Sequence, residues 1–146
     1  MINYYPPQRF ACSCSRCNHV VMDNSDIAPK LLSYLQGLTV SKLFGGRCLA
    51  HHNEVTDKNG RIKTPFSGHI FEKGKLTVRA ADIYPLTGVS LKDFFEQAYT
   101  VGFRRIGFYP RQGFLHVDVL PGELYWDAKD KNYQYYYKYE TLPWRK

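Results

Sequence analysis

Two polar side chains that could bind a metal stand two residues apart in an otherwise apolar segment late in the chain. In GFLHVDV (113–119), His116 and Asp118 alternate with aliphatic residues. Successive side chains of a β-strand point to opposite faces of the sheet, so the imidazole and the carboxylate share one face. The segment therefore predicts a strand that carries a histidine and an aspartate on the same surface.

Two further residues could act with His116. Asp82 lies within the apolar segment LTVRAADIYP (76–85), and His69 lies at the end of a long loop, in FSGHI. An ionised carboxylate in a buried strand is costly unless it is paired or bound to a metal. Two imidazoles and one carboxylate suit zinc with one coordination position left for water. The sequence therefore predicts a catalytic zinc site at His69, Asp82 and His116.

The elements that must position these residues mix helices and strands. We expect helices over 25–38 and 89–103, and strands over 42–48, 76–85, 104–110 and 113–119. Ser25 or Asp26 is expected to cap the first helix, and Ser90 the second. The last two strands are separated by the tight turn PRQG and should pair as a hairpin. The 146 residues predict one α+β domain, a small, mostly antiparallel sheet with flanking helices, after an irregular, cysteine-rich segment 1–24.

Several short motifs occur in an order that resembles the M15 family of zinc D,D-peptidases and related murein endopeptidases, of the small phage and bacterial type. The motifs are SGH (67–69), AADI (80–83), IGFYP (106–110) and FLHVD (114–118), with GGRCLAHHN (45–53) and FACSC (10–14) upstream. The resemblance implies the D,D-carboxypeptidase/Hedgehog-like zinc peptidase fold. It also implies hydrolysis of amide bonds in the stem peptide of bacterial peptidoglycan, by a D-Ala-D-Ala carboxypeptidase, a murein endopeptidase or a phage lysis enzyme.

One spacing departs from the family pattern. His69 and Asp82 are 13 residues apart, which is longer than the family's His-x-x-Gly-x-Ala-x-Asp. Zinc constrains where its ligands lie in space and not their separation in sequence, so an insertion before the Asp82 strand can preserve the site. If His69 is not the ligand, His51 and His52 are the residues to test.

The resemblance implies a carboxylate that takes a proton from water and passes it to the leaving amine. Gly113 stands where many relatives carry that residue. Asp118 is the best remaining base, with the alternative that it orients the zinc-bound His116 instead. Glu72, in the insertion, is a third choice.

Three more residues match family positions. Arg47 corresponds to an arginine that holds a substrate carboxylate, or it is a structural residue of its turn. Ser67 hydrogen-bonds substrate or caps the loop before His69. Tyr109 could stabilise the oxyanion, although packing is the commoner role of a tyrosine in an aromatic strand.

Four cysteines form a second candidate group. Cys12, Cys14 and Cys17 lie close together in sequence, and Cys48 is distant. They could close a structural zinc site, remain buried thiols, or include a disulfide formed after release.

Composition and charge limit the partners. The net charge is +7, yet the chain has no block of five Lys or Arg residues, so we expect no nucleic-acid partner and no membrane partner. MINYYPPQRF (1–10) does not resemble a secretory signal, which predicts synthesis in the cytoplasm and action on the cell wall after release. The Tyr-rich tail (122–146) is expected to form a strand or wrap over the sheet, or an aromatic platform for wall polymers.

We expect a monomeric peptidase. The first alternative is a zinc-bound attachment module of the same fold that has lost catalysis. The second is a zinc-stabilised nucleic-acid-binding protein, which would bind DNA with a steep salt dependence.

Overall fold

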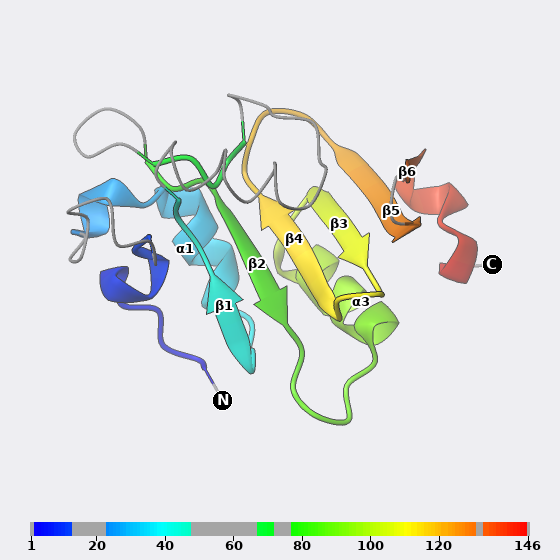
Figure 1. Ribbon diagram of the computed structural model, residues 1–146, viewed down its shortest axis with the longest axis horizontal. Helices are drawn as coiled ribbons and strands as arrows, with labels where there is room; N and C mark the ends of the chain where they lie inside the picture. The colour runs from blue at the N-terminus through cyan, green and yellow to red at the C-terminus, as the bar shows by residue number, and fades with distance from the viewer. Residues whose placement is uncertain (1, 13–22, 48–66, 72–76, 131–132, 146) are drawn as a thin grey trace.

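The computed structural model describes residues 2–12, 23–47, 67–71, 77–130 and 133–145 (Figure 1). Its centre is a six-stranded sheet with the order β1-β2-β4-β3-β5-β6. The strands are β1 (Lys42–Phe44), β2 (Ala80–Tyr84), β3 (Arg105–Tyr109), β4 (Phe114–Asp118), β5 (Leu124–Asp130) and β6 (Tyr133–Tyr137). All neighbouring strands are antiparallel except β3 and β5, which run parallel. The prediction of a mostly antiparallel α+β sheet is confirmed.

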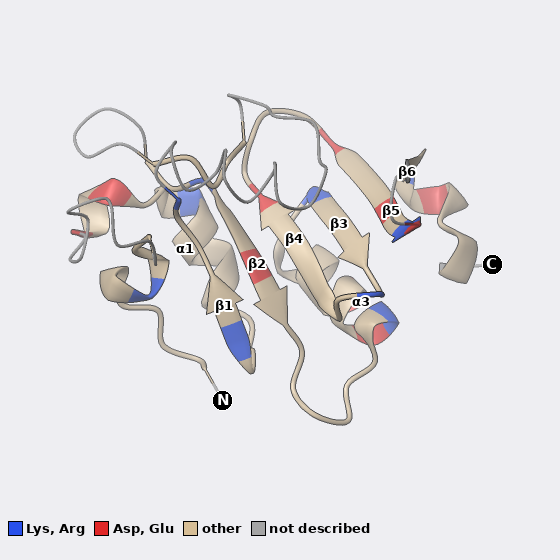
Figure 2. Cartoon of the chain, viewed as in Figure 1, with Lys and Arg blue, Asp and Glu red and all other residues tan. Residues whose placement is uncertain are grey.

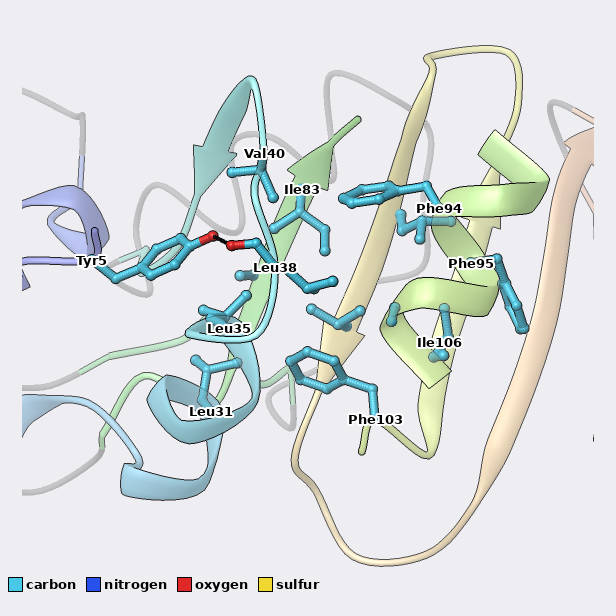
Figure 3. Packing of buried hydrophobic residues seen from close by; sticks show 14 of the residues in the cluster. Tyr5, Leu31, Leu35, Leu38, Val40, Ile83, Phe94, Phe95, Phe103 and Ile106 are labelled. Atoms are coloured by element: carbon cyan, nitrogen blue, oxygen red, sulfur yellow. Dashed lines mark hydrogen bonds between the residues drawn. The ribbon is translucent and has the colours of Figure 1, made fainter. Parts of the chain in front are cut away.

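Two helices, α1 (Pro29–Leu35) and α3 (Leu91–Val101), pack against one face of the sheet (Figure 1). Short 3₁₀ turns flank them: η1 (Pro7–Phe10), η2 (Asn24–Asp26), η3 (Tyr139–Thr141) and η4 (Pro143–Arg145). The core lies between the helices and the sheet. Figure 3 shows Leu31 and Leu35 of α1 on one side of this core, Phe94 of α3 close to Ile83 of β2, and Ile106 of β3 next to α3. The hydroxyl of Tyr5 donates to the Leu38 carbonyl (2.7 Å), which ties the N-terminal segment to this core.

The alternation of side chains in the central strands separates core from site. Leu115, Val117 and Ile83 face the helices and are fully buried. Asp82 and His116 alternate with them and therefore lie on the other face of the sheet. The predicted hairpin of β3 and β4 is confirmed, with Gly107 opposite His116.

Of the two predicted helix caps, the structure contains one and not the other. The Ser90 side chain accepts a hydrogen bond from the backbone N–H of Asp93 (3.1 Å), as expected for the cap of α3. The prediction that Ser25 or Asp26 caps α1 is wrong, because that helix begins at Pro29 after Ala28. Asp26 instead accepts from the N–H of Asp23 (2.7 Å) within η2, and the chain then extends to pair with Val78.

The C-terminal segment completes the sheet and covers α3. The predicted strand in the Tyr-rich tail is β6, whereas β5 was not expected as a strand. Beyond β6, Tyr139 stacks on Tyr99 of α3 at 3.6 Å between ring centroids, and Trp144 stacks on Phe108 at 4.4 Å. Leu142 is fully buried, so the end of the tail belongs to the core. No helix in the described part of the chain is long and apolar enough to cross a membrane.

Candidate metal centre

Three candidate ligand atoms form a triangle with equal sides. Nε2 of His69 lies 3.1 Å from Oδ1 of Asp82 and 3.1 Å from Nδ1 of His116. Nδ1 of His116 lies 3.1 Å from the same Asp82 oxygen. The structure therefore brings together the three residues that the sequence predicts as metal ligands.

The dimensions of this triangle fit zinc. Zinc binds imidazole nitrogen and carboxylate oxygen at about 2.0–2.2 Å. Three atoms that lie 3.1 Å from one another could all bind one ion at this distance, because the centre of their triangle is only about 1.8 Å from each of them. The donor set and its spacing thus suit a zinc ion with one position for water or substrate.

Sheet register positions two of the ligands, and a short loop positions the third. Asp82 and His116 are direct neighbours across β2 and β4. Figure 2 shows the acidic position within β2 in red. The loop before β2 is held from both sides: the Arg47 N–H donates to the His69 carbonyl (2.6 Å), and the Arg79 N–H to the Gly68 carbonyl (2.9 Å). Backbone contacts therefore hold His69 over the sheet despite the long connection to Asp82.

Gly68 allows this loop to lie close to the sheet. A Cβ atom at position 68 would come within 2.8 Å of the Cβ of Ala80. The loop therefore passes directly over Ala80, which is two residues from Asp82 on the same face of β2.

Each histidine has a hydrogen bond that selects its tautomer. Nδ1 of His69 donates to the Gly45 carbonyl (2.7 Å), which leaves the lone pair on Nε2. Nε2 of His116 donates to Oδ2 of Asp118 (2.8 Å), so the lone pair is on Nδ1 once the ring is neutral. Nε2 of His69 and Nδ1 of His116 both face the centre of the triangle, as metal binding requires.

Asp118 is held on the far side of the His116 ring. Its Oδ1 accepts from Nε of Arg105 (2.6 Å) and from the N–H of Leu120 (3.0 Å), while Oδ2 accepts from His116. Its side chain is 2% exposed, compared with 14% for His116 and 21% for Asp82. Asp82 and His116 are therefore partly exposed, whereas Asp118 is buried beside His116 with both oxygens engaged.

Neighbouring charges and hydrogen bonds shift the pKa values of Asp82, His116 and Asp118 toward their charged forms. Burial alone would raise the pKa of Asp82, but the neighbouring His69 and His116 hold it far below its usual range. Burial would lower the pKa of His116, but hydrogen bonds to Asp118 and Asp82, and their charges, raise it to about 9. The pKa of Asp118 is lowered against its burial by His116 and then by Arg105. The two carboxylates therefore stay ionised, and the metal-free site holds a proton on His116.

An indole ring that no sequence pattern indicated packs against the site. The ring of Trp126 in β5 lies 5.3 Å from that of His116 between centroids. It covers Gly107, where a Cβ atom would come within 2.4 Å of the indole. A glycine inside a strand is a signal for such a close approach. Arg105 was also missed, because a contact across two strands leaves no local pattern.

Three other predicted residues, Arg47, Ser67 and Tyr109, make backbone, loop-capping and packing contacts. Arg47 pairs through its backbone with the His69–Phe71 segment. Ser67 accepts from the His69 N–H (3.3 Å), which is a loop-capping contact. The Tyr109 hydroxyl accepts from the Trp126 indole (3.1 Å), and its ring stacks on Phe114.

Some predictions concern residues that the structure does not describe. Cys12 is buried, but Cys14, Cys17 and Cys48 lie outside the described residues, so the cysteine site stays a prediction. His51, His52 and Glu72 also lie outside them.

Comparison of the chain with protein-family models, with curated proteins and with solved structures gives no match.

Proposed function

We propose that this protein is a zinc-dependent peptidase that hydrolyses amide bonds of bacterial cell-wall stem peptides, with the D,D-carboxypeptidase/Hedgehog-like fold. The proposal is supported most by the triangle of His69, Asp82 and His116, whose three donor atoms lie 3.1 Å apart and converge on one point. The ordered motifs that resemble M15 peptidases supply the substrate class. The chain acts as a monomer on the wall after release from the cytoplasm.

Zinc bound here would activate water and polarise the scissile carbonyl. The protein's contribution is to hold the two imidazoles in the required tautomers, through the Gly45 carbonyl and Asp118, and to keep Asp82 ionised. The backbone of Arg47 pairs with the loop that carries His69, which places this residue next to that loop. On the family resemblance, we propose that its guanidinium binds a substrate carboxylate. The contacts of Ser67 and Tyr109 support loop capping and packing.

The contacts of Asp118 support the orienting role over the role of general base. Both of its oxygens are engaged, and it lies on the opposite side of the His116 ring from Asp82. We therefore assign Asp118 to holding His116, and Glu72, three residues after His69 in sequence, becomes the first choice for the base.

Metal content and hydrolysis measured on matched variants test the proposal. Wild-type protein should bind one equivalent of zinc at this site and release amino groups from purified murein. His69→Ala, Asp82→Ala and His116→Ala should each lose that zinc and the hydrolysis, whereas Asp130→Ala, at an exposed aspartate, should lose neither. Full zinc content and full activity in His69→Ala would contradict the ligand assignment.

A zinc-bound attachment module is the second candidate. It is favoured by Gly113 at the family's base position and by the complete engagement of Asp118. It predicts zinc binding and wall binding without release of amino groups, so the same murein assay separates the two functions.

A further inference from the structure

Strand β1 lies beside the candidate metal ligands at the edge of the sheet. Its last residue, Phe44, is directly opposite Asp82 in β2. The carbonyl of the next residue, Gly45, accepts the hydrogen bond from Nδ1 of His69 (2.7 Å). The end of β1 therefore borders two of the three candidate ligands.

The side chains of β1 that share the face of these ligands are open to solvent. Leu43 packs toward the helices, so the alternation of the strand puts Lys42 and Phe44 on the metal-bearing face. Phe44 is 46% exposed and Lys42 is exposed as well, whereas Trp126, on the opposite side of the site, is 7% exposed. The β1 side therefore offers solvent-exposed side chains next to the candidate ligands.

The ammonium group of Lys42 is held against two aromatic rings. It lies 4.8 Å from the centre of the Phe44 ring and 5.2 Å from that of the Tyr84 ring. These two rings meet edge to face, with 6.1 Å between their centroids. The faces of aromatic rings attract a cation. Because Phe44 is the neighbour of Asp82, these contacts hold the positive charge beside the candidate metal ligands.

The charge of Lys42 has no anionic partner in the described part of the chain. In strands β1 to β4, Lys42 and Arg105 are the lysine and arginine residues. Arg105 donates to Asp118 (2.6 Å), and Asp82 pairs with the two histidines. Among the described residues, Lys42 contacts the two rings but makes no ion pair or hydrogen bond. The three N–H donors of its ammonium group therefore remain available for an anion.

We propose that Lys42 binds a carboxylate of the substrate and thereby selects for an acidic group near the bond to be cut. This inference rests on the proposed function and adds a specificity-determining residue to it. Lys42 lies two positions along β1 and one strand across from Asp82, a separation of about 8 Å. An extended peptide covers this distance in about two to three residues. The carboxylate therefore belongs to an acidic side chain or a chain terminus within about three residues of the scissile amide.

Synthetic stem peptides that differ in a single carboxylate test this inference. One form has its glutamate carboxylate and its terminal carboxylate free, the second has only the glutamate amidated, and the third has only the terminus amidated. Zinc-loaded wild-type protein should cleave one amidated form with a kcat/KM about fivefold below that of the free form, because one exposed ion pair is lost. The affected form identifies which carboxylate Lys42 binds.

Substitutions at position 42 assign this preference to the lysine. Lys42→Met, which keeps an apolar side chain of similar length, should remove the preference, and Lys42→Arg should retain it. Lys92→Met, at an exposed lysine of α3 on the other side of the sheet, provides the matched control and should also retain it. Equal cleavage of all three forms by wild-type protein, or an unchanged preference in Lys42→Met, would overturn the inference.

A binding measurement separates this inference from the proposed function. The same peptides, fluorescently labelled, are titrated into the His116→Ala protein, with and without Lys42→Met. Amidation of the carboxylate that Lys42 binds should weaken binding about fivefold at low salt and only when Lys42 is present. If wild-type protein cleaves none of the peptides, the peptidase proposal fails, but binding that depends on both Lys42 and a free carboxylate still supports the inference. Equal binding of all three forms overturns it.

Discussion

The carboxylate of Asp118 accepts a 2.8 Å hydrogen bond from Nε2 of His116, on the side of the imidazole that faces away from the metal ligands. Carboxylates in this position orient a metal-bound histidine and raise its basicity. Asp118→Asn should therefore weaken zinc binding about 10- to 100-fold, measured by competition with a chelator. Asp130→Asn makes the same charge change at an exposed site and should leave affinity unchanged. Wild-type affinity with lost turnover would instead identify Asp118 as the general base.

Arg105 should act on the metal through Asp118. Its Nε donates to Oδ1 of Asp118 at 2.6 Å, so its removal would leave a buried carboxylate with one charged partner fewer. Arg105→Gln should weaken zinc binding about tenfold, and much less in an Asp118→Asn background, because the two residues act in series. Arg104→Gln provides the matched control, since Arg104 donates to the carbonyls of Tyr99 and Phe103 instead. Equal effects of both substitutions would show a general effect of charge.

Metal binding and stability should depend on pH through His116. Its pKa is raised to about 9 in the metal-free fold, above its ordinary value of 6.5. The stability that this proton contributes is complete below about pH 6.5 and is lost as the pH rises through about 9, with a limit of about 3 kcal/mol. Metal-free protein should thus melt at a lower temperature at about pH 9 than at about pH 6, and His116→Ala should reduce this difference.

The same proton must leave before zinc can bind Nδ1 of His116. Zinc affinity should rise up to about tenfold per pH unit between about pH 7 and 9, and calorimetry in buffers of different ionisation enthalpy should detect about one released proton. A constant affinity over this range would show that His116 is already neutral without metal.

Gly107 should be intolerant of any side chain. A Cβ atom there would come within 2.4 Å of the Trp126 indole, which is packed against His116. Gly107→Ala should cost about 1–3 kcal/mol in unfolding free energy, measured by chemical denaturation. In a Trp126→Ala background the same substitution should cost much less, because the clash is removed. An equal cost in both backgrounds would place its cause in the backbone of β3.

Two of the three candidate metal ligands, Asp82 and His116, could be predicted because a buried polar side chain in an apolar strand is visible in the local sequence. A carboxylate in an apolar strand and a histidine that alternates with aliphatic residues both require a partner, and each is visible within a few positions. The face that His116 and Asp82 share follows from the period of a strand alone. Leu115 and Val117 then show which face the helices cover.

The surroundings of the ligands could not be predicted in this way. Trp126 reaches His116 because β5 lies parallel to β3, and no local pattern indicates which strand a later segment will join. Likewise, Arg105 meets Asp118 because of the register of the β3–β4 hairpin. The first helix was misplaced because pairing of Ile27 with Val78 holds the chain extended where capping residues are present.

The two ways in which the ligands are held impose different limits on changes in chain length. His69 depends on backbone contacts of its own loop, so extra residues before β2 can be accommodated without moving its ring. His116 depends on the alternation of β4, where deletion of a single residue would exchange the metal-bearing and helix-covered faces. The loop between His69 and Asp82 can therefore change in length with the candidate metal site intact, whereas any frame change inside β4 would remove that site and the core together.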